Sequence, residues 1–213
     1  MRLLSWTPVA VGSEELARRQ ARYDRLSPPS VRVTLRDLGT RFEDAPRALE
    51  TDADVRASEA AVTAAYEWGG LEDFDALLPD CVLDPAIEAH HLGLPVFGLT
   101  RMTATFLSGL GATVGALARN DAIASELDRR LDSYGVPWEP TVVMDLSFDD
   151  IVDDVTWREA VLAHAGRLRC DFALNACSAV DLGEPATDTL VVDPTALALR
   201  LLGVRTELGG QVA

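Results

Sequence analysis

Two cysteines at equivalent places in the chain are the residues best suited to chemistry. Cys81 ends the segment DALLPDC and Cys177 ends DFALNAC, so both cysteines fall at the same position when the two segments are aligned. A thiolate can remove a proton from a carbon acid, and a thiol on the opposite side can return one. If the two cysteines face each other across a cleft, this exchange inverts the stereocentre. The pair therefore predicts acid–base chemistry at carbon.

The other reactive side chains do not predict a second centre. Cys170 opens the strand that leads to Cys177 and would lie about 20 Å from it at ~3.3 Å per residue, so we interpret it as structural. The three histidines are not arranged around the cysteines as zinc ligands would be, and no metal site is predicted. All 19 basic residues are arginine. Without lysine the chain cannot form the internal Schiff base of ordinary pyridoxal phosphate enzymes.

Short apolar segments alternate with amphipathic stretches along the whole chain. Alternation of this kind predicts an α/β fold with parallel sheets and helices on their faces. Ligands in such sheets bind outside the carboxyl ends of the strands, where both Cys81 and Cys177 are expected. Strands are predicted at residues 2–6, 31–38, 75–78, 95–99, 112–117, 141–146, 171–176 and 189–193, and helices at 13–25, 52–68, 121–134, 157–168 and 195–202.

The match between the two cysteine segments extends into a weak internal repeat. PVFGLTRMTATFLSGLG after Cys81 resembles VVDPTALALRLLG after Cys177, and VTLRDLG in the first half corresponds to VVMDLS in the second. Repeats in the same order indicate two related α/β lobes. Asp84 and Pro85 also predict a helix that begins just after Cys81. Its N-terminus would favour the thiolate, while the charge of Asp84 would oppose it.

Composition and charge restrict the class of partner. The chain has 213 residues and a formal net charge of -15, which argues against nucleic acid or an anionic membrane surface. No apolar segment approaches the ~20 residues of a membrane span, and the N-terminal segment lacks the apolar core of a signal peptide. The sequence therefore predicts a cytoplasmic protein with a small-molecule substrate, and it leaves a homo-oligomer open.

The segments around both cysteines resemble the aspartate/glutamate/hydantoin racemase superfamily, which contains cofactor-independent racemases, maleate isomerases and arylmalonate decarboxylases. DCVLDPAIEAHHLGLPVFGL is similar to the first-cysteine segment of the hydantoin-racemase branch, and CDFALNACSAVDL with TLVVDP is similar to the second. The resemblance covers roughly residues 70–202. It implies two pseudo-symmetric lobes, each a mostly parallel four-stranded sheet flanked by helices, with the active site in the cleft between them.

The resemblance also implies boundaries and roles. Residues 1–98 with 191–213 would form a discontinuous N-terminal lobe, and residues 99–190 would form the C-terminal lobe. Cys81 and Cys177 would be the catalytic residues of a racemase or epimerase that needs no cofactor. Decarboxylases of the family keep only the second cysteine, so the presence of both favours two-cysteine acid–base catalysis.

The chain departs from the family where the substrate would be held. Family members usually end the first strand with Asn-Pro-Asn and the second lobe's first strand with threonines, whereas this chain has Trp-Thr-Pro and Gly-Ala-Leu. Racemases of free amino acids tend to have Asn-Thr after the first cysteine, whereas this chain has Val-Leu. Such side chains would hold an acidic amino acid poorly, which favours a hydantoin-like or other weakly polar substrate. A serine hydroxyl and the backbone N–H groups after the cysteines would stabilise the carbanion. The predicted substrate-binding residues are Trp6, Thr7, Val82, Gly115, Ala116 and Ser178.

Two other functions stay open for the same fold. An isomerase or lyase, like the maleate isomerases or decarboxylases, would use one cysteine and tolerate loss of the other. A non-catalytic relative would bind a small molecule without converting it, and the apolar replacements at the usual polar positions are the main support for that interpretation.

Overall fold

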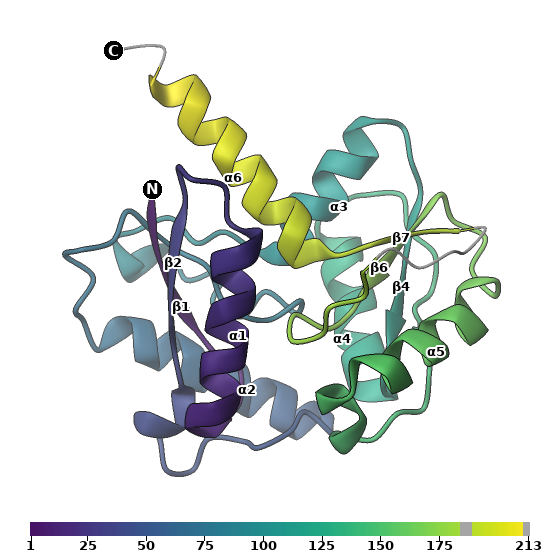
Figure 1. Ribbon diagram of the computed structural model, residues 1–213, viewed down its shortest axis with the longest axis horizontal. Coiled ribbons are helices and arrows are strands. Elements are labelled where there is room, and N and C mark those ends of the chain that lie inside the picture. The colour runs from purple at the N-terminus through teal and green to yellow at the C-terminus, as the bar shows by residue number, and fades with distance from the viewer. Residues whose placement is uncertain (184–188, 211–213) are drawn as a thin grey trace.

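The computed structural model describes residues 1–183 and 189–210, which form two α/β lobes side by side (Figure 1). The first part of the chain contains β1 (Arg2–Trp6), α1 (Gly12–Leu26), β2 (Arg32–Arg36), η1 (Leu38–Thr40), α2 (Asp52–Glu67), β3 (Ala76–Leu77) and η2 (His90–Leu92). There follow α3 (Leu99–Gly109), β4 (Val114–Ala118), α4 (Asp121–Ser133), β5 (Val142–Val143), η3 (Asp149–Val152), α5 (Asp154–Ala165), β6 (Phe172–Asn175), β7 (Leu190–Val192) and α6 (Pro194–Gly210).

Each lobe is built on a parallel sheet, which confirms the predicted fold class. The first sheet has the strand order β2-β1-β3, so it has three strands where four were predicted, and the second has the predicted four, in the order β5-β4-β6-β7. All five residues of β4 are buried, as expected for a strand covered by helices on both faces. The strand predicted at residues 95–99 is wrong except for one bridge between Val96 and Leu77, because Leu99 already begins α3.

Helices begin where the sequence supplies an N-cap. Thr51 and Asp54 form a capping box at the start of α2, in which each side chain accepts from the other residue's backbone N–H. Asn120 caps α4 by accepting from the N–H of Ile123. Asp153 caps α5, so this helix starts at Asp154, three residues before the predicted start. The polar side chains at these helix ends therefore serve as caps that stabilise the helices.

The last helix, α6, returns to the first lobe and lies over its sheet beside α3 (Figure 1). Leu199 and Leu202 belong to the same buried cluster as Leu3 and Val33 of the first sheet. The helix continues to Gly210, beyond the predicted end at residue 202. Residues 211–213 of the predicted first lobe lie outside the described part of the chain. Within residues 1–183 and 189–210, no helix combines the length and hydropathy needed to cross a membrane.

The helix predicted to start at Asp84 is absent, and turns take its place. Asp84 and Ala86 have φ values of 50° and 62°, which do not occur within a right-handed helix. The Asp84 carboxylate instead accepts from the backbone N–H groups of Thr100 and Arg101, at 3.0 and 2.7 Å, in the first turn of α3. Asp84 is thus the N-terminal cap of a different helix, which the local sequence could not indicate.

A glycine makes this distant cap possible. Gly98 is the N-cap residue of α3 and has no side chain to satisfy the first amides of the helix. A Cβ added to Gly98 would lie 2.5 Å from both Cγ and Oδ2 of Asp84. The hydroxyl of Thr100 also donates to Val82 O at 2.6 Å, and Asp84 N–H donates to Cys81 O at 3.2 Å. The start of α3 therefore holds the segment that carries Cys81.

Candidate active site

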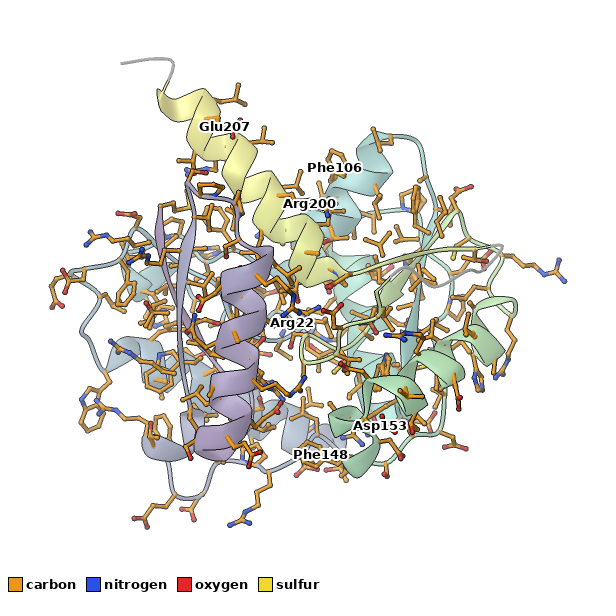
Figure 2. The ribbon with its side chains drawn as sticks, viewed as in Figure 1. Arg22, Phe106, Phe148, Asp153, Arg200 and Glu207 are labelled. Carbon is orange, nitrogen blue, oxygen red and sulfur yellow. The ribbon has the colours of Figure 1, made fainter. Side chains whose placement is uncertain are left out.

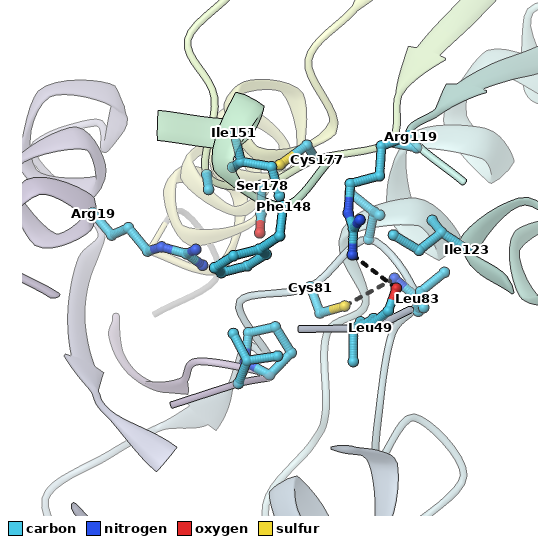
Figure 3. Close-up of a pocket in the computed structure, with 15 residues that line it drawn as sticks. Arg19, Leu49, Cys81, Leu83, Arg119, Ile123, Phe148, Ile151, Cys177 and Ser178 are labelled. Atoms are coloured by element: carbon cyan, nitrogen blue, oxygen red, sulfur yellow. Dashed lines mark hydrogen bonds between the residues drawn. The ribbon is translucent and has the colours of Figure 1, made fainter. Parts of the chain in front are cut away.

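Both predicted catalytic cysteines line one pocket between the lobes (Figure 3). Cys81 follows β3 of the first sheet, and Cys177 follows β6 of the second. The cavity has a volume of about 60 Å³. Most of its wall is apolar and comes from both lobes, with side chains of Val9, Leu49, Val82, Ile123, Phe148 and Ile151.

The residues next to the two cysteines are joined by a hydrogen bond across the lobes. The hydroxyl of Ser178 donates to the backbone carbonyl of Asp80 at 2.9 Å. Ser178 also lines the pocket, as does Val82. The structure therefore brings four of the predicted site residues together, namely Cys81, Val82, Cys177 and Ser178.

Helix α1 supplies two buried arginines that hold these segments. Arg19 Nη1 donates to the Asp80 carboxylate at 3.0 Å, and the hydroxyl of Tyr23 donates to the other oxygen of that carboxylate at 2.9 Å. Arg22 donates to the carbonyls of Ser178 and Val180 at 2.9 and 3.0 Å. Figure 2 shows Arg22 on the side of α1 that faces the second lobe. One helix of the first lobe thus fixes both cysteine segments.

Arg22 also forms an ion pair with Asp193, the residue just before α6. Burial raises the pKa of the Asp193 carboxyl, although Arg22 and the backbone N–H groups of Ala196 and Thr195 act in the opposite direction. Arg22 therefore links the loop after Cys177 to the beginning of the helix that returns to the first lobe.

The two thiols lie in different electrostatic surroundings. Burial raises the pKa of Cys81 well above its ordinary value, and the carboxylates of Asp80 and Asp84 raise it further. The N–H of Leu83, 3.4 Å from the Cys81 sulfur, acts in the opposite direction.

Burial also raises the pKa of Cys177, but there the guanidinium groups of Arg19 and Arg22 oppose the shift. Cys177 is thus the thiol with cations beside it, and Cys81 is the thiol with carboxylates beside it. We conclude that Cys177 loses its proton more easily than Cys81 does.

Four predicted substrate-binding residues do not line the pocket. Trp6 and Thr7 are buried at the end of β1, and the chain reaches the cavity slightly later, at Pro8 and Val9. The hydroxyl of Thr7 is used inside the fold, where it donates to Val9 O at 2.7 Å. β1 ends at Trp6 as predicted, so the error was to expect the pocket directly at the end of the strand.

The same error affects the second lobe. Gly115 and Ala116 lie inside β4, which runs on to Ala118, and the cavity is lined by Arg119. A Cβ at Gly115 would lie 2.9 Å from the sulfur of Cys170, so this glycine faces packing behind the strand. That contact also agrees with the interpretation of Cys170 as structural.

Sequence reasoning missed the arginines Arg19, Arg22 and Arg119. Arg19 and Arg22 carried a usable signal, because they share the buried face of α1 with Tyr23. A buried arginine needs a partner, which points to a site or an interface. Arg119 directly follows a fully buried strand, at the edge where ligands bind in α/β sheets. No group of three or more histidine, cysteine or acidic side chains suited to a metal ion occurs in the described residues.

Solved structures of other proteins share this architecture. An allantoin racemase from Pseudomonas fluorescens matches 98% of this chain and 92% of its own, with a TM-score of 0.80 and 16% identity. The fold is that of the aspartate/glutamate/hydantoin racemases. An allantoin racemase from Klebsiella pneumoniae matches with a TM-score of 0.76 and 14% identity over 98% of this chain and 89% of that one. An aspartate racemase from Picrophilus torridus follows at 0.60 and 14%, over 97% and 94%.

The same racemase fold also occurs in an arylmalonate decarboxylase and in a maleate isomerase from Pseudomonas putida. No protein-family model matches the sequence. None of the curated proteins is similar enough in sequence to count as a relative. At these identities the likeness establishes the fold, and the chemistry must be argued from the residues of the pocket.

Proposed function

We propose that the protein is a cofactor-independent racemase or epimerase that inverts a carbon acid next to a carbonyl group, with Cys81 and Cys177 as its acid and base. The observation that carries the proposal is that two cysteines from different sheets line the same pocket. A thiolate on one side of the substrate takes the proton from carbon, and the thiol on the other side gives a proton to the opposite face. The product is the mirror-image centre.

The unequal surroundings of the thiols support this division of labour. In either direction of a two-base inversion, one group must be ionised while the other carries a proton. Arg19 and Arg22 beside Cys177, and Asp80 and Asp84 beside Cys81, favour that unequal state over two thiolates. Cys177 is then the base for one enantiomer in the resting enzyme, and Cys81 is the acid.

A hydantoin-like substrate is the class that we propose. The wall of the pocket is mostly apolar, which suits a weakly polar ring better than an open-chain amino acid with two or three charges. A carbon between a ring carbonyl and a ring nitrogen is acidified by the ring itself. Two of the structural neighbours are allantoin racemases, and allantoin is a substituted hydantoin.

The test is hydrogen exchange in deuterated water with enantiopure 5-substituted hydantoins, followed by NMR and polarimetry against a protein-free blank. The wild-type protein should exchange the C5 proton and lose optical rotation together. Cys81→Ser and Cys177→Ser should each abolish inversion, while exchange without inversion can survive for one enantiomer. Cys170→Ser, a change of the same size outside the pocket, should behave like the wild type.

Two results would contradict parts of the proposal. Inversion that survives either Cys81→Ser or Cys177→Ser would exclude the two-base mechanism and favour an isomerase or lyase that uses one cysteine. Rapid exchange of free aspartate or glutamate, with none of the hydantoins, would exclude the substrate class and leave the mechanism standing.

A non-catalytic binding protein is the second candidate, and one observation favours it. Both pocket thiols have pKa values above their ordinary value because they are buried, whereas a catalytic thiolate is usually stabilised. A binder predicts that a hydantoin saturates the protein in a titration while its C5 proton remains unexchanged in deuterated water. The exchange experiment therefore separates the two functions directly.

A further inference from the structure

Arg119 stands directly after β4 and lines the pocket on the side opposite Arg19 (Figure 3). Its side chain is only 2% exposed. Its Nη1 lies 2.9 Å from both carboxylate oxygens of Glu50, and its Nη2 donates to the backbone carbonyl of Leu49 at 2.8 Å. The Nε–H is buried as well, and no acceptor for it occurs among the described residues. One N–H of a buried cation is therefore left without a protein partner.

The charge of Arg119 is also less well balanced than that of Arg19. Arg19 pairs with Asp80 and Glu15, whose side chains are 1% and 19% exposed. Arg119 pairs with Glu50, whose side chain is 50% exposed at the rim. Water screens an exposed carboxylate much more than a buried one. We conclude that the positive potential within the pocket comes mainly from Arg119.

The chemistry under "Proposed function" creates a negative charge that this cation can meet. When a thiolate removes the proton from carbon, the electron pair of the C–H bond forms a C–C double bond and the carbonyl electrons move to oxygen. A preorganised donor aimed at that oxygen lowers the barrier. When the opposite thiol returns a proton to carbon, the carbonyl is restored and no charge remains on oxygen.

The free N–H groups of Arg119 can donate to a substrate. A guanidinium carries five N–H groups, and the contacts with Glu50 and Leu49 use three of them. Within the described residues, the Nε–H and one N–H of Nη2 therefore have no acceptor. A carbonyl oxygen that gains negative charge is an acceptor suited to such a donor.

We propose that Arg119 is a catalytic residue whose Nε–H binds the carbonyl oxygen beside the reacting carbon. The catalytic part rests on the proposed racemase function. The binding part does not, since a ring without an exchangeable C–H would bind in the same way.

Calorimetric titration with 5,5-dimethylhydantoin tests the binding part, because this ring has no hydrogen on C5 and cannot turn over. The wild-type protein should bind it, and Arg119→Met should weaken binding at least about tenfold, as expected for loss of a charged hydrogen bond. Arg129→Met is the matched control, since it removes the same charge from an exposed position of the same lobe and should change affinity less than about twofold.

Arg119→Lys keeps the proposal testable if Arg119→Met fails to fold, as judged by circular dichroism. Lysine keeps the charge but lacks the Nε–H, so binding of the ring should still weaken, and kcat for a 5-substituted hydantoin should fall about 10²-fold or more. Wild-type protein that does not bind the ring, or equal affinity in the Arg119 variants, would overturn the proposal. Arg119-dependent binding of the ring without exchange of any hydantoin would instead refute the racemase function alone.

Discussion

Substitution of Gly98 by alanine tests the contact on which the position of Cys81 depends. The added Cβ would lie 2.5 Å from Cγ and Oδ2 of Asp84 and 2.9 Å from Oδ1, closer than carbon and carboxyl atoms can approach. The carboxylate would have to move away from the N–H groups of Thr100 and Arg101 and from the hydroxyl of Tyr134, which donates to it at 2.8 Å.

The expected cost follows from these contacts. Overpacking of a tight site costs about 1–3 kcal/mol, and a hydrogen bond to a charged group contributes about 1.5–3 kcal/mol. Loss of one of the three bonds with partial relaxation gives about 4 kcal/mol. For a chain of this length, 1 kcal/mol corresponds to about 2–4 °C in Tm, so Gly98→Ala should lower Tm by roughly 10 °C.

Gly109→Ala is the matched control for this prediction. Gly109 ends the same helix, and a Cβ there would meet nothing within 4 Å. Alanine at that position should leave stability unchanged or raise it by about 0.5–1 kcal/mol. Thermal unfolding by circular dichroism and urea titration measure both variants. Equal Tm values for Gly98→Ala and Gly109→Ala would refute the role assigned to the Asp84 carboxylate.

Two further predictions concern ionisation. Iodoacetamide should alkylate both pocket cysteines more slowly than a free thiol at pH 8, and Cys177 should react before Cys81 as the pH rises. Peptide mass spectrometry measures the order of labelling. Earlier labelling of Cys81 would contradict the assigned electrostatics. Burial raises the pKa of Asp84 to about 6, against an ordinary value of 3.8, so the stability that protonated Asp84 provides is complete below pH 3.8 and is lost as pH rises to about 6. Between pH 4 and 6 the unfolding free energy of the wild type should therefore fall by about 2 kcal/mol relative to Asp84→Asn, and parallel pH profiles would argue against the shift.

The sequence by itself was sufficient to predict the architecture and the two cysteines. Short apolar segments alternating with amphipathic ones specify a parallel α/β fold, because each segment can bury its residues only in that arrangement. The carboxyl edge of such a sheet is where loops converge, so a cysteine directly after a strand was expected to face a pocket. Cys81 and Cys177 satisfied both conditions from local patterns alone.

The point at which each strand meets the pocket was harder to predict, and this moved four predicted contacts out of the pocket. β1 ends at Trp6 as predicted and β4 ends at Ala118, one residue beyond its predicted end, but in both lobes the cavity is lined only by residues that follow the strand. The pocket therefore begins later, at Val9 in one lobe and Arg119 in the other. A shift of two to four residues does not alter a fold prediction, but it replaces one set of side chains in a site by another.

The tertiary structure alone decided which polar groups pair. Asp84 reads locally as the cap of its own helix, yet it caps α3, because in the fold the bare amides of Thr100 and Arg101 lie beside it. Arg22 reaches the carbonyl of Ser178, 156 residues away in the sequence. A buried charge must find a partner wherever the packed chain brings one, and sequence spacing carries no record of that distance. The sequence thus determined where the thiols stand, and long-range packing determined the charges that surround them.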